Sequence, residues 1–327
     1  MRIQLYRLHI ITGVEAVMSP KIVVVGSINM DLVVRSPRTP KPGENLFGSD
    51  FQLVPGGKGA NQAVTAAKLG AESIMIARVG NDVFGDTLLS GLRECGVVTV
   101  CIAKSDGVST GVALIVVNDE GENCIIIVSG ANGALSPADV DTFDNVIGSA
   151  DAVLLQFEIP METVAHTIEV ANRHNVPVVL DAGPAQECSP ELISKVTIIS
   201  PNESETKALT GIEVVDLDAA KRAARWLLDT GAKIAVLKLG SKGALLAYGD
   251  TIKHIEGIKV PVVDTTAAGD VFSAALTLAF ARGESLEDAV TYANYAGALA
   301  VTRFGAQTST PTADELAKFI QSIKNQR

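Results

Sequence analysis

Short apolar runs alternate along this chain with longer segments whose apolar residues recur three or four positions apart. The continuous runs that predict strands are residues 22–25, 152–155, 176–180, 197–199 and 234–237. The spaced segments that predict helices are residues 161–174, 217–230 and 272–282. Strands that are apolar throughout are buried on both faces, and their alternation with helices is typical of a parallel sheet between two helical layers. We therefore expect a three-layer α/β/α fold with a mostly parallel central sheet, whose ligands bind beyond the carboxyl ends of the strands.

Two regions, residues 31–55 and 109–130, contain strand patterns without intervening helices. The second predicts a hairpin of residues 110–117 and 123–128, joined by turn residues 118–121. Extra β structure beside a ligand crevice can form a lid, but it can also be an interaction edge or a surface addition. The sequence pattern leaves these three interpretations open.

The chain begins with a segment outside this rhythm. Residues 1–17 are mildly apolar, but Arg7, His9 and Glu15 interrupt them and no small-residue cleavage site follows, so the signal-peptide pattern is not met. Met18 then precedes the first predicted strand. We expect residues 1–17 to be a dispensable extension and residues 18–327 to form a single domain that includes the two β segments.

The composition is that of an ordinary globular protein, and it disfavours several classes. Hydrophobic residues make up 47% of the chain and charged residues 20%, so a core can be buried and disorder is not expected. The formal net charge of -10 disfavours non-specific nucleic-acid binding, which needs a basic surface. No apolar stretch reaches the roughly 18 residues that a membrane-spanning helix needs. We therefore expect neither a nucleic acid nor a membrane as a partner.

The cysteines and histidines show no zinc-site spacing. The four cysteines form no CxxC pair, and the four histidines form no HExxH motif. Scattered thiols without a pairing pattern are typical of a reducing compartment. We therefore expect a cytoplasmic protein with reduced cysteines.

The strongest chemical signal is Asp264-Thr-Thr-Ala-Ala-Gly-Asp270, which runs directly into a predicted helix. Small residues at the start of a helix leave backbone N–H groups unpaired at its positive end, a place suited to phosphate oxygens. A carboxylate there could accept the proton of a hydroxyl group that attacks phosphorus. Alone, Asp270 could equally be an ordinary helix-capping residue. The small residues before it and the upstream Asp264 strengthen the case for chemistry.

A second signal is the glycine-rich stretch Pro55-Gly-Gly-Lys-Gly-Ala-Asn-Gln62. It is not a Walker motif, because Gly59 follows Lys58 where that motif has the Ser or Thr that binds magnesium. No GxGxxG follows the first strand either, which disfavours a dinucleotide-binding fold. The stretch offers a bare backbone to a polar ligand, with Lys58 and Asn61 as donors. A glycine turn without a ligand is the alternative.

Three further segments place polar residues at the ends of predicted strands. Asn29 and Asp31 point the same way on an extended segment and could bind vicinal hydroxyls, although each alone could be a turn residue. Ser200-Pro-Asn-Glu-Ser-Glu205 opens a helix, where acids in the first turn are favourable without any ligand. Lys238-Leu-Gly-Ser-Lys-Gly243 is a glycine turn after a strand and could accept a nucleotide.

Together these five segments resemble the ribokinase/PfkB family of carbohydrate kinases, over essentially all of residues 20–325. Two stretches match the family's signature regions, Gly56–Gln62 and Asp264–Asp270. Glu158 and the tail Ala300–Gln307 are similar to the ribose-phosphorylating branch in particular. The resemblance implies ATP-dependent phosphorylation of D-ribose at its 5-hydroxyl, which gives ribose 5-phosphate and ADP.

The resemblance also implies a role for each matching residue. Asp270 would be the catalytic base, and the backbone of Ala267, Ala268 and Gly269 would form an anion hole. The implied substrate-binding residues are Asn29, Met30, Asp31, Gly57, Lys58, Gly59, Ala60, Asn61, Glu158 and Asp270. The residues implied to border the nucleotide are Asn202, Lys238, Leu239, Gly240, Ser241, Lys242, Gly243, Gly269, Asp270 and Asn294.

Two metals are implied by the same resemblance. Glu205 would help to organise Mg²⁺, often through water. A monovalent cation, usually K⁺, would lie beside the anion hole. Its implied ligands, many of them backbone carbonyls, are Asp264, Thr266, Ala300, Arg303, Gly305 and Ser309. The two β segments resemble the family's lid, which in ribose kinases also forms a homodimer contact.

The chain departs from the family pattern at three places. Lys238 stands where Thr is common, and Ser273 stands where Asn is common. Asp181-Ala-Gly-Pro184 replaces a common Asn-Pro-Ala-Pro. The nucleotide contact of Lys238 is therefore left open, whereas the proposed base and sugar residues are unaffected.

Other functions remain as alternatives. A relative could phosphorylate deoxyribose, fructose or a nucleoside, although the polar cluster of Asn29, Asp31 and Asn61 and an aromatic content of only 4% favour a small polyol over a stacked base. A sugar sensor without catalysis would be expected to lose the catalytic base or the acid that helps to organise Mg²⁺, yet Asp270 and Glu205 are both present. A dehydrogenase is disfavoured by the missing dinucleotide motif.

Overall fold

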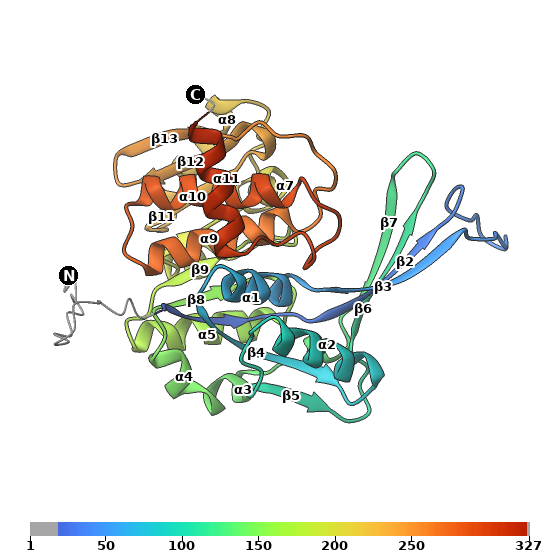
Figure 1. The fold of residues 1–327 in the computed structure, drawn as a ribbon. Coiled ribbons are helices and arrows are strands. Elements are labelled where there is room, and N and C mark those ends of the chain that lie inside the picture. Colours follow the sequence, from blue (N-terminus) through green and yellow to red (C-terminus); the bar gives the residue numbers. More distant parts are fainter. Residues whose placement is uncertain (1–18, 326–327) are drawn as a thin grey trace.

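The apolar runs form one nine-stranded sheet in the computed structural model, which describes residues 19–325 (Figure 1). Its strands, in spatial order, are β13 (Thr251–Glu256), β12 (Gly243–Tyr248), β11 (Ile234–Lys238), β10 (Ile198–Ile199), β9 (Val178–Leu180), β8 (Ala152–Leu155), β1 (Lys21–Val25), β4 (Glu72–Gly80) and β5 (Ile102–Ser105). Neighbours from β5 to β11 pair in parallel, which confirms the mostly parallel sheet. The antiparallel strands β12 and β13 at one edge were not predicted. The extension predicted over residues 1–17 lies outside the described residues.

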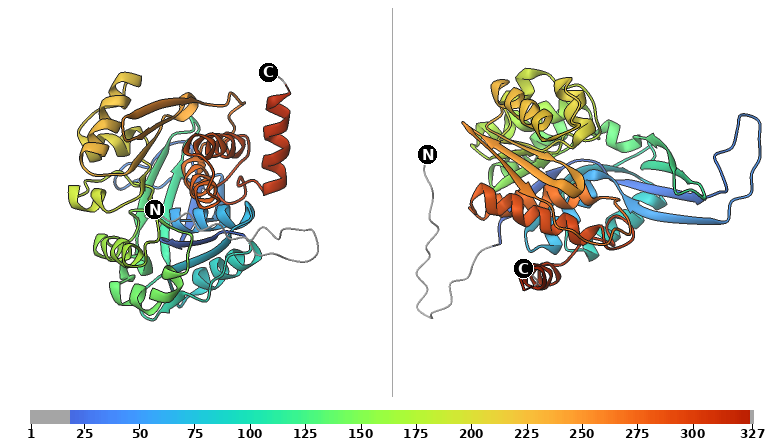
Figure 2. Two further views of the ribbon diagram at one scale, coloured as in Figure 1. Left: turned by 90° about the vertical axis from the view of Figure 1, so that its left-hand side faces the viewer. Right: turned by 90° about the horizontal axis from the view of Figure 1, so that it is seen from above.

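Helices cover both faces of this sheet (Figure 2). One layer consists of α1 (Lys58–Lys68), α2 (Val83–Glu94), α9 (Ala268–Ala281), α10 (Leu286–Ala300) and α11 (Ala313–Lys324). The other consists of α3 (Pro137–Thr142), α4 (Asp144–Gly148), α5 (Met161–Arg173), α6 (Pro190–Ser194), α7 (Glu203–Thr210) and α8 (Leu217–Asp229). Successive residues of a strand point to opposite faces, so Ile22 and Val24 enter the first core while Val23 and Val25 enter the second. The three-layer prediction is confirmed.

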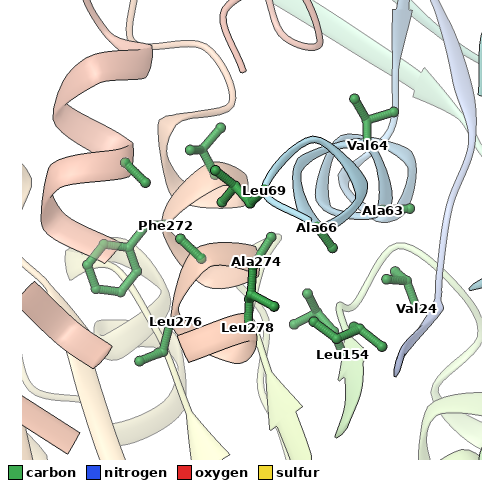
Figure 3. Packing of buried hydrophobic residues seen from close by; sticks show 14 of the residues in the cluster. Val24, Ala63, Val64, Ala66, Leu69, Leu154, Phe272, Ala274, Leu276 and Leu278 are labelled. Atoms are coloured by element: carbon green, nitrogen blue, oxygen red, sulfur yellow. The ribbon is translucent and has the colours of Figure 1, made fainter. Parts of the chain in front are cut away.

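Two helices of the first layer, α1 and α9, pack side by side above the central strands (Figure 3). Ala66 of α1 and Ala274 of α9 are fully buried at this contact, and such small side chains let helices approach closely. Val24 and Leu154 close the space below them from β1 and β8. This packing fixes the two helices relative to each other, which matters because both begin at the same edge of the sheet.

A second, four-stranded sheet projects from the body of the molecule (Figure 1). Its strands, in spatial order, are β3 (Asp50–Gly56), β2 (Asn29–Arg35), β6 (Gly111–Val117) and β7 (Asn123–Val128). The antiparallel pairing of β6 with β7 confirms the predicted hairpin. The parallel pairing of β2 with β6, which joins the two predicted β segments, has no local signal in the sequence. We call these four strands the small sheet. Within residues 19–325, no helix is long and apolar enough to cross a membrane.

Candidate active site

Polar side chains gather where five neighbouring parallel strands of the large sheet end. Strand β1 lies between β4 and β8, so the strand order reverses there and leaves a crevice at the carboxyl edge, the usual ligand position in such sheets. The residues that follow or end these strands are Asn29 after β1, Glu158 after β8, Asp181 after β9, Glu205 after β10, and Lys238 at the end of β11. The predicted site residues are therefore brought to one edge of the sheet.

Asp270 lies in the first turn of α9 and is only 4% exposed. Its Oδ2 accepts a hydrogen bond from Asn61 Nδ2 at 2.9 Å, and its Oδ1 accepts one from Gln62 Nε2 at 3.3 Å. The ammonium of Lys58 lies 3.6 Å from Oδ1. The first turns of α1 thus hold the carboxylate in place, a contact between two motifs that neither motif predicts alone.

The start of α9 is open to a ligand. Ala267 has a φ of 58° and a ψ of 8°, a left-handed conformation that costs about 1 kcal/mol or more for a non-glycine residue. Among the hydrogen bonds of residues 19–325, none is donated by the backbone N–H of Ala267, Gly269 or Asp270. The N–H of Ala268, expected in the anion hole, instead donates to the Thr265 carbonyl at 3.2 Å. Three N–H groups therefore remain for an anion at the positive end of this helix.

Asn29 is fixed by a residue that sequence reasoning missed. Its Oδ1 accepts from Asn132 Nδ2 at 2.7 Å, while Asn132 Oδ1 accepts from the Ile28 N–H at 2.8 Å. Both asparagines are buried. The sole sequence signal for Asn132 is an Asn in the Gly-Ala-Asn-Gly segment after the predicted hairpin.

Three carboxylates lie near one another beside Asn29. Burial, together with the nearby carboxylates of Glu158 and Asp270, raises the pKa of Asp31 to about 7 from its ordinary value of 3.8. Glu158 Oε2 accepts from Ser27 Oγ and, at 3.0 Å, from the Lys58 N–H. Glu158 therefore satisfies the first backbone N–H of α1, a helix whose capping residue has no side chain.

That capping residue is Gly57, which must be a glycine. Its φ of 90° is left-handed, and a Cβ on it would lie 2.8 Å from the Asn29 nitrogen. The close approach lets the start of α1 pass directly beside the chain that carries Asn29. Met30, Gly59 and Ala60 are buried in the same crossing.

A buried network of opposite charges lies behind this cluster. Lys238 Nζ lies 2.7 Å from Asp181 Oδ1 and 3.7 Å from Glu205 Oε2. The other Asp181 oxygen accepts from Gln62 Nε2 at 2.8 Å and from Ser273 Oγ at 3.1 Å. Gln62 thus connects Asp181 with Asp270, a link that was not predicted.

The network shifts the pKa values of its members in different directions. Although complete burial raises the pKa of Asp181, the ammonium groups of Lys238 and Lys58 hold it below its ordinary value. Burial raises the pKa of Glu205 in spite of Lys238. The carboxylate of Asp270 raises the pKa of Lys58, so its ammonium stays charged. The pocket therefore keeps the positive charge of Lys58 among its carboxylates.

Asn202 and Glu205 form a helix cap, as one interpretation of the sequence predicted. Asn202 Oδ1 accepts from the Glu205 N–H at 2.9 Å, and Glu205 Oε2 accepts from the Asn202 N–H at 2.7 Å. The two side chains also line a polar cavity of about 290 Å³. Capping and ligand binding are therefore compatible at these positions.

That polar cavity adjoins a more apolar one of about 410 Å³. The polar cavity is lined by Lys58, Asn202, Glu203, Glu205, Lys238, Gly240, Thr265, Ala267, Gly269 and Asp270. The apolar cavity is lined by residues that include Ser241, Gly243, Phe272 and Asn294. Lys238, Gly240, Thr265 and Gly269 belong to both. A ligand with an apolar end and an anionic end would fit across the seam, the boundary at which these four residues belong to both cavities.

Two of the residues expected at the nucleotide, Leu239 and Lys242, line neither cavity. Leu239 is 4% exposed and packs into the second core. The carbonyl of Lys242 accepts from His254 Nε2 at 2.7 Å. Asn294 lines the apolar cavity, but its amide group also donates to the carbonyl oxygens of Ile255 and Glu256 at 3.3 and 3.4 Å.

The loop before α9 is tied to the segment after α10. Asp264 Oδ1 accepts from the Thr266 N–H at 2.9 Å, and Asp264 Oδ2 accepts from the Gly305 N–H at 2.9 Å. Of the other residues expected at a cation, Ala300 and Ser309 are buried. The side chain of Arg303 forms an ion pair with Glu315. Among residues 19–325, no three His, Cys, Asp or Glu side chains form a group that could hold a metal ion.

The geometry can be compared with known proteins. The model of the "pfkB family carbohydrate kinase" matches residues 19–313, which is most of the chain. The chain belongs to the pfkB family of carbohydrate kinases.

Several members of the pfkB family resemble this chain over their whole length. A ribokinase of Haemophilus influenzae is 39% identical over 304 residues, which cover 93% of this chain and 99% of that protein. A deoxyribokinase of Salmonella typhi is 36% identical over 300 residues, which cover 91% and 98%. The structure of Arabidopsis thaliana ribokinase complexed with ribose and ATP superimposes with a TM-score of 0.87 at 35% identity, covering 93% and 99%. The pfkB-family fold predicted from the sequence is thus confirmed.

Proposed function

We propose that this protein transfers the γ-phosphoryl group of ATP to the 5-hydroxyl of D-ribose, giving ribose 5-phosphate and ADP. The observation that carries the proposal is the position of Asp270. Its carboxylate is held by Asn61 and Gln62 beside the free backbone N–H groups at the start of α9, at the wall of the polar cavity. The similar ribokinases, one of them complexed with ribose and ATP, support the choice of both substrates.

Asp270 acts as the general base. The sugar hydroxyl donates its proton to the carboxylate as the hydroxyl oxygen attacks the γ-phosphorus, and the bond to the β-phosphate oxygen breaks in line with that attack. The N–H groups of Gly269 and Asp270 stabilise negative charge on the phosphoryl oxygens. Lys58, whose ammonium lies 3.6 Å from Asp270 Oδ1, keeps a positive charge beside the reacting groups.

The sugar is held on the side of Asp270 that is opposite the nucleotide. Asn29 and Asp31 bind its vicinal hydroxyls, together with Glu158 and the backbone of residues 57–61. Asn132 locks the Asn29 side chain, so the sugar meets a fixed amide orientation. The small sheet serves as a lid over the sugar, since the start of its strand β2 carries Asn29 and Asp31.

The donor set of the polar cavity fits a magnesium ion. Glu205, Asn202 and Asp270 offer oxygens to it, and Mg²⁺ usually keeps several waters and takes one or two carboxylates together with substrate phosphates. When bound, it would neutralise charge on the phosphate oxygens of ATP. Glu205 would hold the water molecules around the ion, and the hydrogen bonds that its oxygens accept from Asn202 fix its orientation.

The proposed monovalent cation fits the loops beside α9. Asp264 joins the turn at Thr266 to the segment at Gly305, so the backbone oxygens expected to bind K⁺ belong to two connected loops. When bound, K⁺ would add positive charge beside the anion hole. Asp264 contributes to this site by holding the two loops together through the hydrogen bonds that its carboxylate accepts.

A substrate panel tests the proposal. ADP release coupled to NADH oxidation is measured with D-ribose, 2-deoxy-D-ribose, D-fructose and adenosine, at saturating ATP and Mg²⁺. We expect the highest kcat/KM with ribose. The second candidate is deoxyribose, favoured by the similarity to the Salmonella deoxyribokinase, and it is the answer if deoxyribose exceeds ribose. Turnover with none of the four compounds would refute the proposed function.

We also propose that the small sheet forms a homodimer contact. Its strands β3, β6 and β7 expose several large apolar side chains, which marks an interaction surface. The exposed apolar residues are Phe51, Leu53, Leu114, Ile125, Ile126, Ile127 and Val128. Light scattering should give twice the mass of one chain, and Ile126→Asp should give the monomer mass.

The free cysteines support a cytoplasmic protein, where ATP is also available.

A further inference from the structure

Lys238 stands at the seam of the two cavities. It ends β11, lines both the polar and the apolar cavity, and its side chain is only 10% exposed. A Cβ placed on Gly269 would lie 3.7 Å from Lys238 Nζ. The buried ammonium of Lys238 therefore lies close to Gly269, in the first turn of α9.

The position of this ammonium is set by Asp181. The pair is 2.7 Å apart, and Asp181, fully buried, is in turn held by Gln62 and Ser273. Glu205 lies farther away, at 3.7 Å, which is beyond hydrogen-bond distance. An ammonium has three donors. Asp181 takes one of them, so Lys238 keeps donors for a ligand at the seam.

The polar cavity is lined by two ammonium groups, those of Lys58 and Lys238, and by the carboxylates of Glu203, Glu205 and Asp270. Lys58 is engaged with Asp270, the base on the sugar side. Lys238 is the corresponding cation on the nucleotide side, beside Gly269. Because the reacting phosphoryl group must lie between Asp270 and the nucleotide, the ammonium of Lys238 borders its path.

We propose that Lys238 donates to the oxygens of the terminal phosphoryl group of the nucleotide, and that Asp181 is the positioning residue that orients it. The proposal rests on the proposed use of ATP and deepens it. It assigns to this chain a fixed phosphate-binding cation, built from two residues that both depart from the family pattern.

The alternative is an ion pair that only stabilises the fold. Removing Lys238 alone would leave Asp181 charged and buried without its partner, which is strongly destabilising. The test therefore uses the double variant Lys238→Met/Asp181→Asn, which removes both charges and keeps the side-chain sizes. Lys233→Met, at the exposed residue immediately before the same strand, is the matched control for the loss of one positive charge.

Nucleotide binding is measured by calorimetry without sugar, using AMP, ADP and a non-hydrolysable ATP analogue. A charge-assisted hydrogen bond lost from the terminal phosphate predicts that the double variant binds the ATP analogue about 10- to 100-fold more weakly. Its affinity for AMP should stay within about twofold of wild type. In turnover, kcat should fall while KM for ribose stays near wild type, and Lys238→Arg should retain part of the ATP affinity.

Two results would overturn the proposal. One is an equal loss of affinity for AMP and the ATP analogue, which would mean a general disturbance of the cavity. The other is wild-type affinity and kcat in a double variant that differs only in its thermal unfolding temperature, which would mean a purely structural ion pair. The binding arm uses no sugar, so failure of the ribose assignment in the substrate panel is a separate outcome.

Discussion

The substitution Asp31→Asn should stabilise the empty protein while it weakens sugar binding. Asp31 is partly buried near Glu158 and Asp270, and this environment raises its pKa to about 7 from 3.8. Folding thus favours the protonated carboxyl. The favourable contribution is complete below pH 3.8 and is lost as the pH rises through about 7. An asparagine side chain at this position resembles the protonated form and carries no charge to lose.

The size of the effect follows from the shift. One unit of pKa corresponds to about 1.4 kcal/mol, and the ionisation of Asp31 opposes folding increasingly between about pH 5 and pH 7. The stability gained by Asp31→Asn should therefore grow by about 2–3 kcal/mol from pH 5 to pH 8. At pH 8, above the raised pKa of Asp31, the same change removes a charged acceptor from the proposed sugar site, so kcat/KM for ribose should fall about tenfold or more.

Urea denaturation at pH 5, 6, 7 and 8 measures the first effect, and ADP release measures the second. Asp119→Asn is the matched control, because it makes the same charge change on an exposed turn of the small sheet. Its difference from wild type should stay nearly constant across these pH values. A difference for Asp31→Asn that does not change with pH would refute the argument that burial and neighbouring carboxylates oppose its charge.

Three further substitutions test separate parts of the site. Asp270→Asn should lower kcat by about 10²–10⁴ with little change in the unfolding temperature, and a kcat within tenfold of wild type would contradict its role as base. Asp264→Ala should cost about 1–3 kcal/mol of stability, because it leaves the Gly305 N–H without its acceptor, and it should abolish activation by K⁺ over tetramethylammonium; full retention of that activation would place the cation elsewhere. Gly183→Ala should lower kcat/KM about tenfold or more, since its Cβ would lie 2.6 Å from Glu205 Oε1 and 2.9 Å from Lys58 Nζ, and wild-type kinetics would show that these side chains are free to move.

Features with local causes could be predicted from the sequence. The strands β1, β8 and β11 appear as continuous apolar runs because both of their faces are buried. The cap formed by Asn202 and Glu205 spans four residues, so its geometry is contained in one short segment. The hairpin of β6 and β7 was equally predictable from its two strand patterns and the turn residues between them.

Features that depend on distant residues could not be predicted. Gln62 bridges Asp181 and Asp270, which lie 119 and 208 positions away along the chain. The glycine-rich motif identifies Gln62 as polar but says nothing of which carboxylates the fold will bring to it. The same holds for Asn132, which meets Asn29 across 103 positions. Strand β12 is apolar throughout, so its pattern does not distinguish an antiparallel strand from a parallel one.

The small sheet joins the sugar site to a distant surface through one strand. At one end of β2, Asn29 pairs with Gly56 and Gly111; at the other end, Arg35 pairs with Asp50 and Val117. Seven residues of strand span roughly 20 Å. The two ends share the same ladder, so a twist applied at the outer end would be passed along it to the amide and carboxylate at the inner end. With the proposed sugar contacts of Asn29 and Asp31, sugar affinity would then be a quantity that can be tuned mechanically, by a clamp or a synthetic binder on the outer strands, without altering any group that carries out the chemistry.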